Sequence, residues 1–182
     1  MTRKHLLDVN VVIALVEPGH QHFQRTQKWF RTFTRGTWGL CPLTETAFLR
    51  ITTNPAFRPG PRSMGQAIAV LQMMKSHHRH VYWEIKDSWV DVTIPFAHRI
   101  LGHQQVTDAY LLGLAIKEDG MLVTFDRGLK YLAGSEFTRN LLVLASLPVP
   151  CSLAPVPCPL SPRPLCPVPS SPSSLVPCSL VP

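Results

Sequence analysis

The chain has 182 residues, a length that suits one domain with a single core, and Lys and Arg outnumber Asp and Glu by 18 to 11. The formal net charge of +7 favours a polyanionic partner such as nucleic acid, although most of the basic residues are scattered and suit solvated faces. Of the five cysteines only Cys41 precedes residue 150, which excludes a disulfide framework or a paired zinc motif in the core and fits a reducing cytoplasm.

The amino-terminal apolar run is not predicted to be a targeting or membrane segment. Asp8 and Asn10 interrupt it, and no small-residue cleavage site follows before Glu17-Pro18. No other stretch has the length of a membrane span.

Short apolar runs alternate with helical patterns as far as residue 147, which predicts an α/β fold with parallel strands covered on both faces. The predicted strands are 5–7, 37–41, 81–84, 121–125 and 141–145. The predicted helices are 9–16, 20–33, 44–53, 63–76, 95–101 and 107–119, with a turn or short helix at 128–133.

The stretch from Gln105 to Gly128 is the most informative part of the chain. Thr107 is expected to cap a helix whose first turn holds Asp108, and Gly120 is expected to end it in the left-handed conformation. The strand that follows ends on Asp126. Because open α/β sheets bind ligands at the carboxyl ends of their strands, Asp126 lies where a site is expected.

Three further acids repeat this placement. Asp8 directly follows the first predicted strand, while Glu45 and Asp108 each lie in the first turn of a helix that starts at the same edge of the sheet. Helix capping alone would explain either Glu45 or Asp108, but it does not explain four acids at one edge. The other acids lie in turns or irregular polar stretches and are interpreted as solvated.

Clustered carboxylates indicate a cation. They repel one another by about 1 kcal/mol per pair at roughly 4 Å in water, and by more when partly buried. Oxygen ligands without His or Cys at usable spacing favour Mg²⁺ or Mn²⁺ over zinc, so the histidines at 77, 78 and 80 are interpreted as a polar rim. One or two such ions can activate water and stabilise the leaving oxygen of a phosphodiester, which is nuclease chemistry.

Three segments, LLDVNVVIAL, LTETAFLRITTNP and VTDAYLLGLAIKEDGMLVTFDRGL, resemble the PIN-domain ribonuclease toxins of the VapC type. The resemblance covers roughly residues 4–146. It implies a PIN-like three-layer α/β fold with a central parallel sheet of about five strands flanked by helices. It also implies Mg²⁺-dependent cleavage of RNA, with Mn²⁺ as a possible substitute, a cognate antitoxin protein and a homodimer. The catalytic and metal-binding residues that it implies are Asp8, Glu45, Asp108 and Asp126, with Asn10, Thr107 and Thr124 at supporting polar positions.

The composition changes after residue 147, which predicts a nuclease domain over 1–147 and a Pro-, Ser- and Cys-rich tail over 148–182. Twelve of the 18 prolines lie in the tail, and Arg163 is its only charged residue. The segments VPCSLAP, VPCPLSP and VPCSLVP repeat within it, and prolines without backbone donors favour polyproline II or disorder. The repeats could be a ligand for a partner protein that recognises proline-rich segments. They could equally arise by read-through of repetitive DNA and have no function.

Two other functions remain open at this point. An aspartyl-phosphate phosphatase would need a second Asp two residues after Asp8, where this chain has Asn10. A noncatalytic PIN-like module that binds RNA or protein would not need all four acids. The sequence does not identify the RNA, because single-stranded RNA is selected by loop shape and stacking for which no short motif is present.

Overall fold

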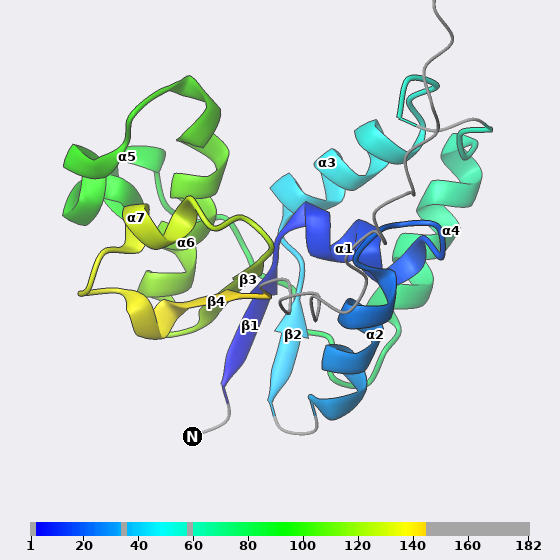
Figure 1. The fold of residues 1–182 in the computed structure, drawn as a ribbon, viewed down its shortest axis with the longest axis horizontal. Helices are drawn as coiled ribbons and strands as arrows, with labels where there is room; N and C mark the ends of the chain where they lie inside the picture. Colours follow the sequence, from blue (N-terminus) through cyan, green and yellow to red (C-terminus); the bar gives the residue numbers. More distant parts are fainter. Residues whose placement is uncertain (1–2, 34–35, 58–59, 145–182) are drawn as a thin grey trace, which may run out of the picture. The chain divides into compact units, whose positions relative to one another are not determined.

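A computed structural model describes residues 3–33, 36–57 and 60–144. Its strands form one parallel sheet in the order β2-β1-β3-β4 (Figure 1). They are β1 (Lys4–Leu7), β2 (Thr37–Gly39), β3 (Met121–Thr124) and β4 (Leu141–Val143).

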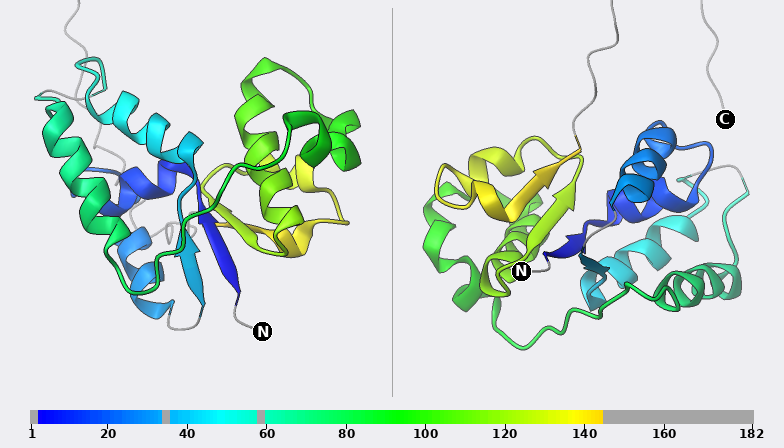
Figure 2. Two further views of the ribbon diagram at one scale, coloured as in Figure 1. Left: turned by 180° about the vertical axis from the view of Figure 1, so that it is seen from behind. Right: turned by 90° about the horizontal axis from the view of Figure 1, so that it is seen from below.

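Helices cover both faces of the sheet, which confirms the predicted α/β architecture with flanking helices. Figures 1 and 2 show α1 to α4 on one side and α5 to α7 on the other. The α-helices are α1 (Val9–Val16), α2 (Phe23–Thr32), α3 (Pro42–Thr52), α4 (Met64–Lys75), α5 (Trp89–Thr93), α6 (Val106–Lys117) and α7 (Leu129–Ala133). The 3₁₀ helices are η1 (Ile94–Arg99), η2 (His103–Gln105) and η3 (Thr138–Asn140).

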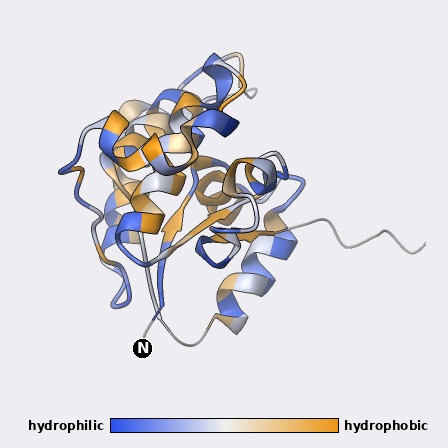
Figure 3. Ribbon diagram, turned by 90° about the vertical axis from the view of Figure 1, so that its left-hand side faces the viewer, coloured by the Kyte–Doolittle hydropathy of each residue, from blue (hydrophilic) through white to orange (hydrophobic). Residues whose placement is uncertain are grey.

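The core consists of two hydrophobic clusters, one on each face of the sheet. Leu6 of β1 and Leu122 of β3 belong to the cluster that includes α5 and α6, whereas Leu7 and Val123 belong to the one that includes α1 and α3. Neighbouring residues of a strand point to opposite faces, so strands covered on both faces are apolar throughout. Figure 3 shows the hydrophobic colour along parts of the strands in the middle of the molecule.

The strand expected at 81–84 is not regular, so the described part of the sheet has four strands rather than about five. The segment still runs alongside β2: the amides of Val81 and Trp83 donate to the carbonyls of Trp38 and Leu40, both at 2.9 Å. Its single ladder pair joins Trp38 with His80. The Trp83 side chain is buried against the glycines of neighbouring segments, while Val81 is exposed, so the segment lacks the two covered faces of the inner strands.

Several helix ends differ from the expectations, and α2, for example, begins at Phe23 rather than at residue 20. Helix α3 starts at Pro42 rather than at a Thr44 cap, because the Thr44 hydroxyl reaches back to accept from the Cys41 amide at 3.0 Å. Thr107 does not cap α6, since η2 leads directly into that helix at Val106. Asp119, with φ of 46°, takes the left-handed conformation expected of Gly120. At Gly120 a Cβ atom would lie 2.5 Å from the ring of Trp83, so close packing requires that glycine.

The strand order places a topological switch point between β1 and β3. The chain leaves β1 for β2 on one side and later returns on the other side of β1 to form β3. Ligands of open α/β sheets bind at such a point, outside the carboxyl ends of the strands.

No helix in the described ranges is both long and apolar enough to cross a membrane. The predicted tail over 148–182 lies outside the described residues, and the division of the chain at residue 147 stays a prediction.

Candidate active site

The hydroxyl of Thr124 joins the ends of β1 and β3 at the switch point. Thr124 is fully buried at the end of β3, and its Oγ1 donates to Oδ2 of Asp8 at 2.7 Å. The same oxygen accepts from Nδ2 of Asn10 at 3.2 Å and from the amide of Asp126 at 3.0 Å. A hydroxyl has one proton to donate and two lone pairs, so all of its hydrogen-bonding capacity is used. Thr124 therefore fixes three of the predicted site residues relative to one another.

Asp8 is the buried member of the site, with 5% of its surface exposed. It is the N-cap residue of α1, but its side chain makes no capping hydrogen bond. Burial raises the pKa of this carboxyl, and the charge of Asp126 raises it further, although the hydrogen bond from Thr124 opposes both effects. The fold thus buries the carboxyl group of Asp8 although this side chain does not cap the helix. A carboxyl group in such a position is a candidate for a catalytic role.

Asp108 lies in the first turn of α6, where every residue from 109 to 115 is buried between the sheet and α5. Its carboxylate makes no hydrogen bond or ion pair within the described part of the chain. Burial first, and then the charges of Asp8 and Asp126, raise the pKa of this carboxyl from 3.8 to about 6. The direction of this shift agrees with the position of Asp108 at the same edge of the sheet as Asp8 and Asp126.

Asp126 is exposed and follows the end of β3. Its Oδ1 accepts from the amide of Gly128 at 2.7 Å, and its own amide donates to Thr124. These two bonds fix the turn that presents the carboxylate at the carboxyl edge of the sheet.

The structure places Glu45 differently from the three aspartates. Its carboxylate forms an ion pair with Lys75 at the end of α4, with 2.8 Å between Oε1 and Nζ. It does not contribute to the raised pKa of Asp8 or of Asp108. The structure thus places Asp8, Asp108 and Asp126 at one edge of the sheet, and the role of all four acids as metal ligands stays a prediction.

The two remaining supporting residues differ in their surroundings. Oδ1 of Asn10 is buried without a hydrogen-bond partner in the described ranges, beside the Thr124 hydroxyl that its Nδ2 contacts. Thr107 is exposed on α6.

The donors at this edge suit a hard divalent cation. They are carboxylate oxygens, and the unpaired amide oxygen of Asn10 could accept from a metal-bound water. Within the residues that the structure describes, no three Asp, Glu, His or Cys side chains are arranged to hold one ion. The aspartates would therefore have to approach one another around a cation, which would replace their repulsion by attraction.

His22 and Phe125 also lie at this edge, and the sequence analysis did not single them out. Their rings stack with centroids 4.3 Å apart and planes 28° from parallel, and Phe125 directly precedes Asp126. The two residues are far apart in the chain, and no local pattern signals a contact of this kind.

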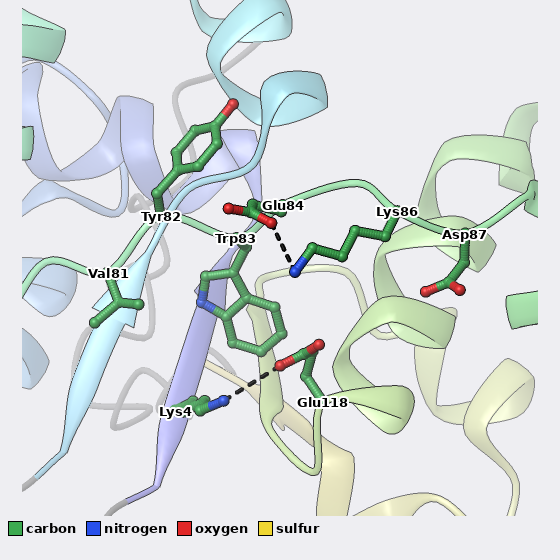
Figure 4. Close-up of a pocket in the computed structure, with 8 residues that line it drawn as sticks. All are labelled: Lys4, Val81, Tyr82, Trp83, Glu84, Lys86, Asp87 and Glu118. Carbon is green, nitrogen blue, oxygen red and sulfur yellow. Dashed lines mark hydrogen bonds and ion pairs between the residues drawn. The ribbon is translucent and has the colours of Figure 1, made fainter.

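A separate cavity of about 230 Å³ lies at the opposite end of the same elements (Figure 4). It borders Lys4 at the start of β1 and Glu118 just after α6, whereas Asp8 follows β1 and Asp108 is at the start of α6. Its charges are paired, Lys4 with Glu118 at 3.2 Å and Lys86 with Glu84 at 2.7 Å. This cavity is therefore distinct from the aspartate site.

Comparison with known proteins gives similar sequences but no matching family model. The chain is 40% identical to ribonuclease VapC38 of Mycobacterium tuberculosis over 128 residues, which cover 70% of this chain and 89% of that protein. It is 35% identical to ribonuclease VapC44 of the same organism over 135 residues, covering 74% of this chain and 94% of the relative.

A solved structure shares the fold. The crystal structure of VapBC2 from Rickettsia felis bound to a DNA fragment of its promoter aligns with a TM-score of 0.55 and 13% identity. The alignment covers 78% of this chain and 98% of that one. At this identity the likeness concerns the fold alone.

Proposed function

This chain belongs to the VapC family of ribonucleases, and on that basis we propose that it is a metal-dependent endoribonuclease and the toxin of a toxin-antitoxin pair. The observation that carries the proposal is the position of Asp8, Asp108 and Asp126 at the carboxyl edge of the sheet, where Asp8 is buried and accepts a hydrogen bond from Thr124. A noncatalytic binding module would not require three carboxylates at this edge of the sheet.

Asp8, Asp108 and Asp126 would hold Mg²⁺ or Mn²⁺, with Glu45 as a fourth ligand once it leaves Lys75. When bound, such an ion lowers the pKa of a water molecule and stabilises the leaving oxygen of a phosphodiester.

The side chains around the aspartates have separate tasks in this proposal. Thr124 holds Asp8 in place through a bond of 2.7 Å, and Asn10 presents a free amide oxygen to orient a water. The net charge of +7 attracts the RNA backbone.

The partners belong to the proposal as well. The Rickettsia felis neighbour is a VapBC2 complex, which supports a cognate antitoxin protein for this chain. We also propose that the chain forms a homodimer, that its substrate is RNA and that it acts in the cytoplasm.

The test is cleavage of single-stranded RNA by the purified chain. We expect cleavage with Mg²⁺ or Mn²⁺, none with EDTA, and a loss of at least about 100-fold for Asp126→Asn, since removal of one catalytic group commonly has effects of this size. Asp119→Asn is the matched control because Asp119 is an exposed aspartate in a turn, with 79% of its side chain accessible. Cleavage that persists in EDTA, or survives in Asp126→Asn, would refute the metal mechanism, and RNA binding without any cleavage would favour the noncatalytic module.

A further inference from the structure

The His22–Phe125 stack is an aromatic contact at the carboxyl end of β3, where Phe125 directly precedes Asp126. Phe125 lies between Thr124, which holds Asp8, and Asp126, and His22 directly precedes α2. Both side chains are half-buried, so each ring packs on the protein while part of it faces solvent.

Local hydrogen bonds hold His22 in position. Its amide donates to Nδ1 of His20 at 3.2 Å, and its carbonyl accepts from the amide and the hydroxyl of Thr26 at 2.9 Å and 2.7 Å. These bonds hold the backbone of His22, and the contact with Phe125 limits the rotation of its ring. A ring limited in this way loses less conformational entropy when a ligand stacks on it.

A positively charged side chain lies near the stack. Arg25 lies one turn further along α2, and its Nη1 is buried without a hydrogen-bond partner in the described ranges. Lys28 and Arg31 follow at the same spacing, both exposed, and α2 contains no acidic residue. The helix therefore presents positive charge from the stack onward, without carboxylates that would neutralise it.

We propose that the His22–Phe125 stack is the platform on which one base of a single-stranded RNA lies beside the aspartate site, while Arg25 binds a phosphate of the same strand. Single-stranded RNA is recognised mainly by bases that stack on aromatic or imidazole rings and by cations that follow the backbone. The stack positions substrate and takes no part in the chemical step. This inference rests on the proposed ribonuclease function and specifies how that site holds its substrate.

A purely structural contact would behave differently. If His22 only packs α2 against the end of β3, His22→Ala would lower thermal stability and leave the dependence of binding on the nucleobases unchanged. The experiment must therefore measure base dependence in addition to affinity.

Binding is measured by fluorescence anisotropy in EDTA, so that no cleavage occurs. The probes are one labelled single-stranded oligoribonucleotide and a series in which one nucleotide at a time is made abasic. For the wild-type chain we expect one position at which base removal weakens binding about tenfold or more, the size of a lost stacking contact. His22→Ala should weaken binding of the intact RNA by a similar factor, and base removal at that position should then have little additional effect.

The control is His78→Ala. His78 is exposed and stacks on His77 with centroids 4.5 Å apart and planes 25° from parallel, in the loop after α4. Its removal should change neither affinity nor base dependence. If His22→Ala melts too low to assay, His22→Phe and His22→Leu replace it: the flat ring of Phe should retain the base dependence, and Leu should lose it.

Arg25→Gln tests the phosphate contact. The slope of log affinity against log salt concentration should fall by about 0.7, the value for one contact to a single strand. Arg50→Gln, at an exposed residue in the last turn of α3, should leave the slope unchanged.

The possible outcomes distinguish a failure of this inference from a failure of the proposed ribonuclease function. If the wild-type chain cleaves RNA but His22→Ala keeps the full base dependence, the platform is refuted and the ribonuclease function stands. If the wild-type chain neither binds nor cleaves any RNA tested, the proposed function fails and the platform fails with it.

Discussion

The carboxyl of Asp108 retains its proton to a higher pH than an ordinary aspartate, because it is partly buried beside two other acids. Its pKa rises from 3.8 in the unfolded chain to about 6 in the fold, so between these values the folded state binds more protons than the unfolded state. The stability that this proton provides is fully present below pH 3.8 and is lost as the pH rises through about 6.

Asp108→Asn should therefore stabilise the metal-free protein at neutral pH. Because the carboxyl is partly exposed and solvent screens its interactions, we expect the free energy of unfolding at pH 7 to increase by only about 1 kcal/mol, with little difference from the wild type near pH 4. Urea denaturation at both pH values in EDTA measures this, with Asp119→Asn as an exposed control. A loss of stability at pH 7 would mean that Asp108 serves the fold, as a helix-capping acid would.

The residues of the site could be predicted from the sequence only in part. Asp8, Asp108 and Asp126 follow from their positions at strand ends and in a first helical turn, and the structure places them at one edge of the sheet. The ion pair of Glu45 with Lys75 could not be predicted, because it depends on how α3 and α4 pack. The contact between His22 and Phe125 has the same origin, since distant segments meet there only in the folded chain.

At the scale of the elements, periodicity predicted helices and inner strands more accurately than it predicted their ends. Helix Val9–Val16 is confirmed to the residue, strands β2, β3 and β4 each lie within a predicted run, and β1 starts one residue before its run. The errors arose where tertiary packing decides the local conformation. Gly120 was expected to end the helix with a positive φ, but Asp119 takes that conformation instead. Residue 120 must be glycine because the ring of Trp83 packs against it.

Gly113 shows how an element depends on its neighbour. A Cβ atom there would lie 2.4 Å from the carbonyl oxygen of Val92, so α5 can approach α6 only because residue 113 is glycine. Gly113→Ala should therefore force the helices apart and lower the free energy of unfolding by about 1 to 3 kcal/mol, despite the better helix propensity of alanine.

Gly65→Ala is the matched control for that change. Gly65 lies in α4 with no atom within 4 Å of an added Cβ, so alanine should stabilise the chain by up to about 1 kcal/mol. Thermal denaturation of both variants checks the opposite signs. Similar melting temperatures for the two would show that α5 and α6 can separate without cost.

At the scale of the whole molecule, the proposed metal site would link stability to metal binding. A ligand that binds only the folded state stabilises it by about 2.7 kcal/mol at 100 times its dissociation constant. Mg²⁺ or Mn²⁺ should therefore raise the melting temperature by roughly 5 to 10 °C for a chain of this size. Differential scanning fluorimetry measures this response, with NaCl at equal ionic strength as the control.

The same measurement on two protein variants tests where the ion binds. Asp126→Asn should lose most of the response, and Asp119→Asn, which changes an exposed aspartate outside the site, should keep it. An equal response in both variants would place the cation elsewhere on the molecule.

The hydrogen bond from Thr124 to Asp8 joins residues separated by 116 positions in the sequence. During synthesis on the ribosome Asp8 is made early, but Thr124 and Asp126 are absent until the chain through β3 has been translated. At about 5 to 20 residues per second, this interval lasts on the order of ten seconds. If the proposed function holds, a nascent chain is therefore inert as a nuclease for most of its own translation, because the aspartate site is incomplete until β3 has emerged.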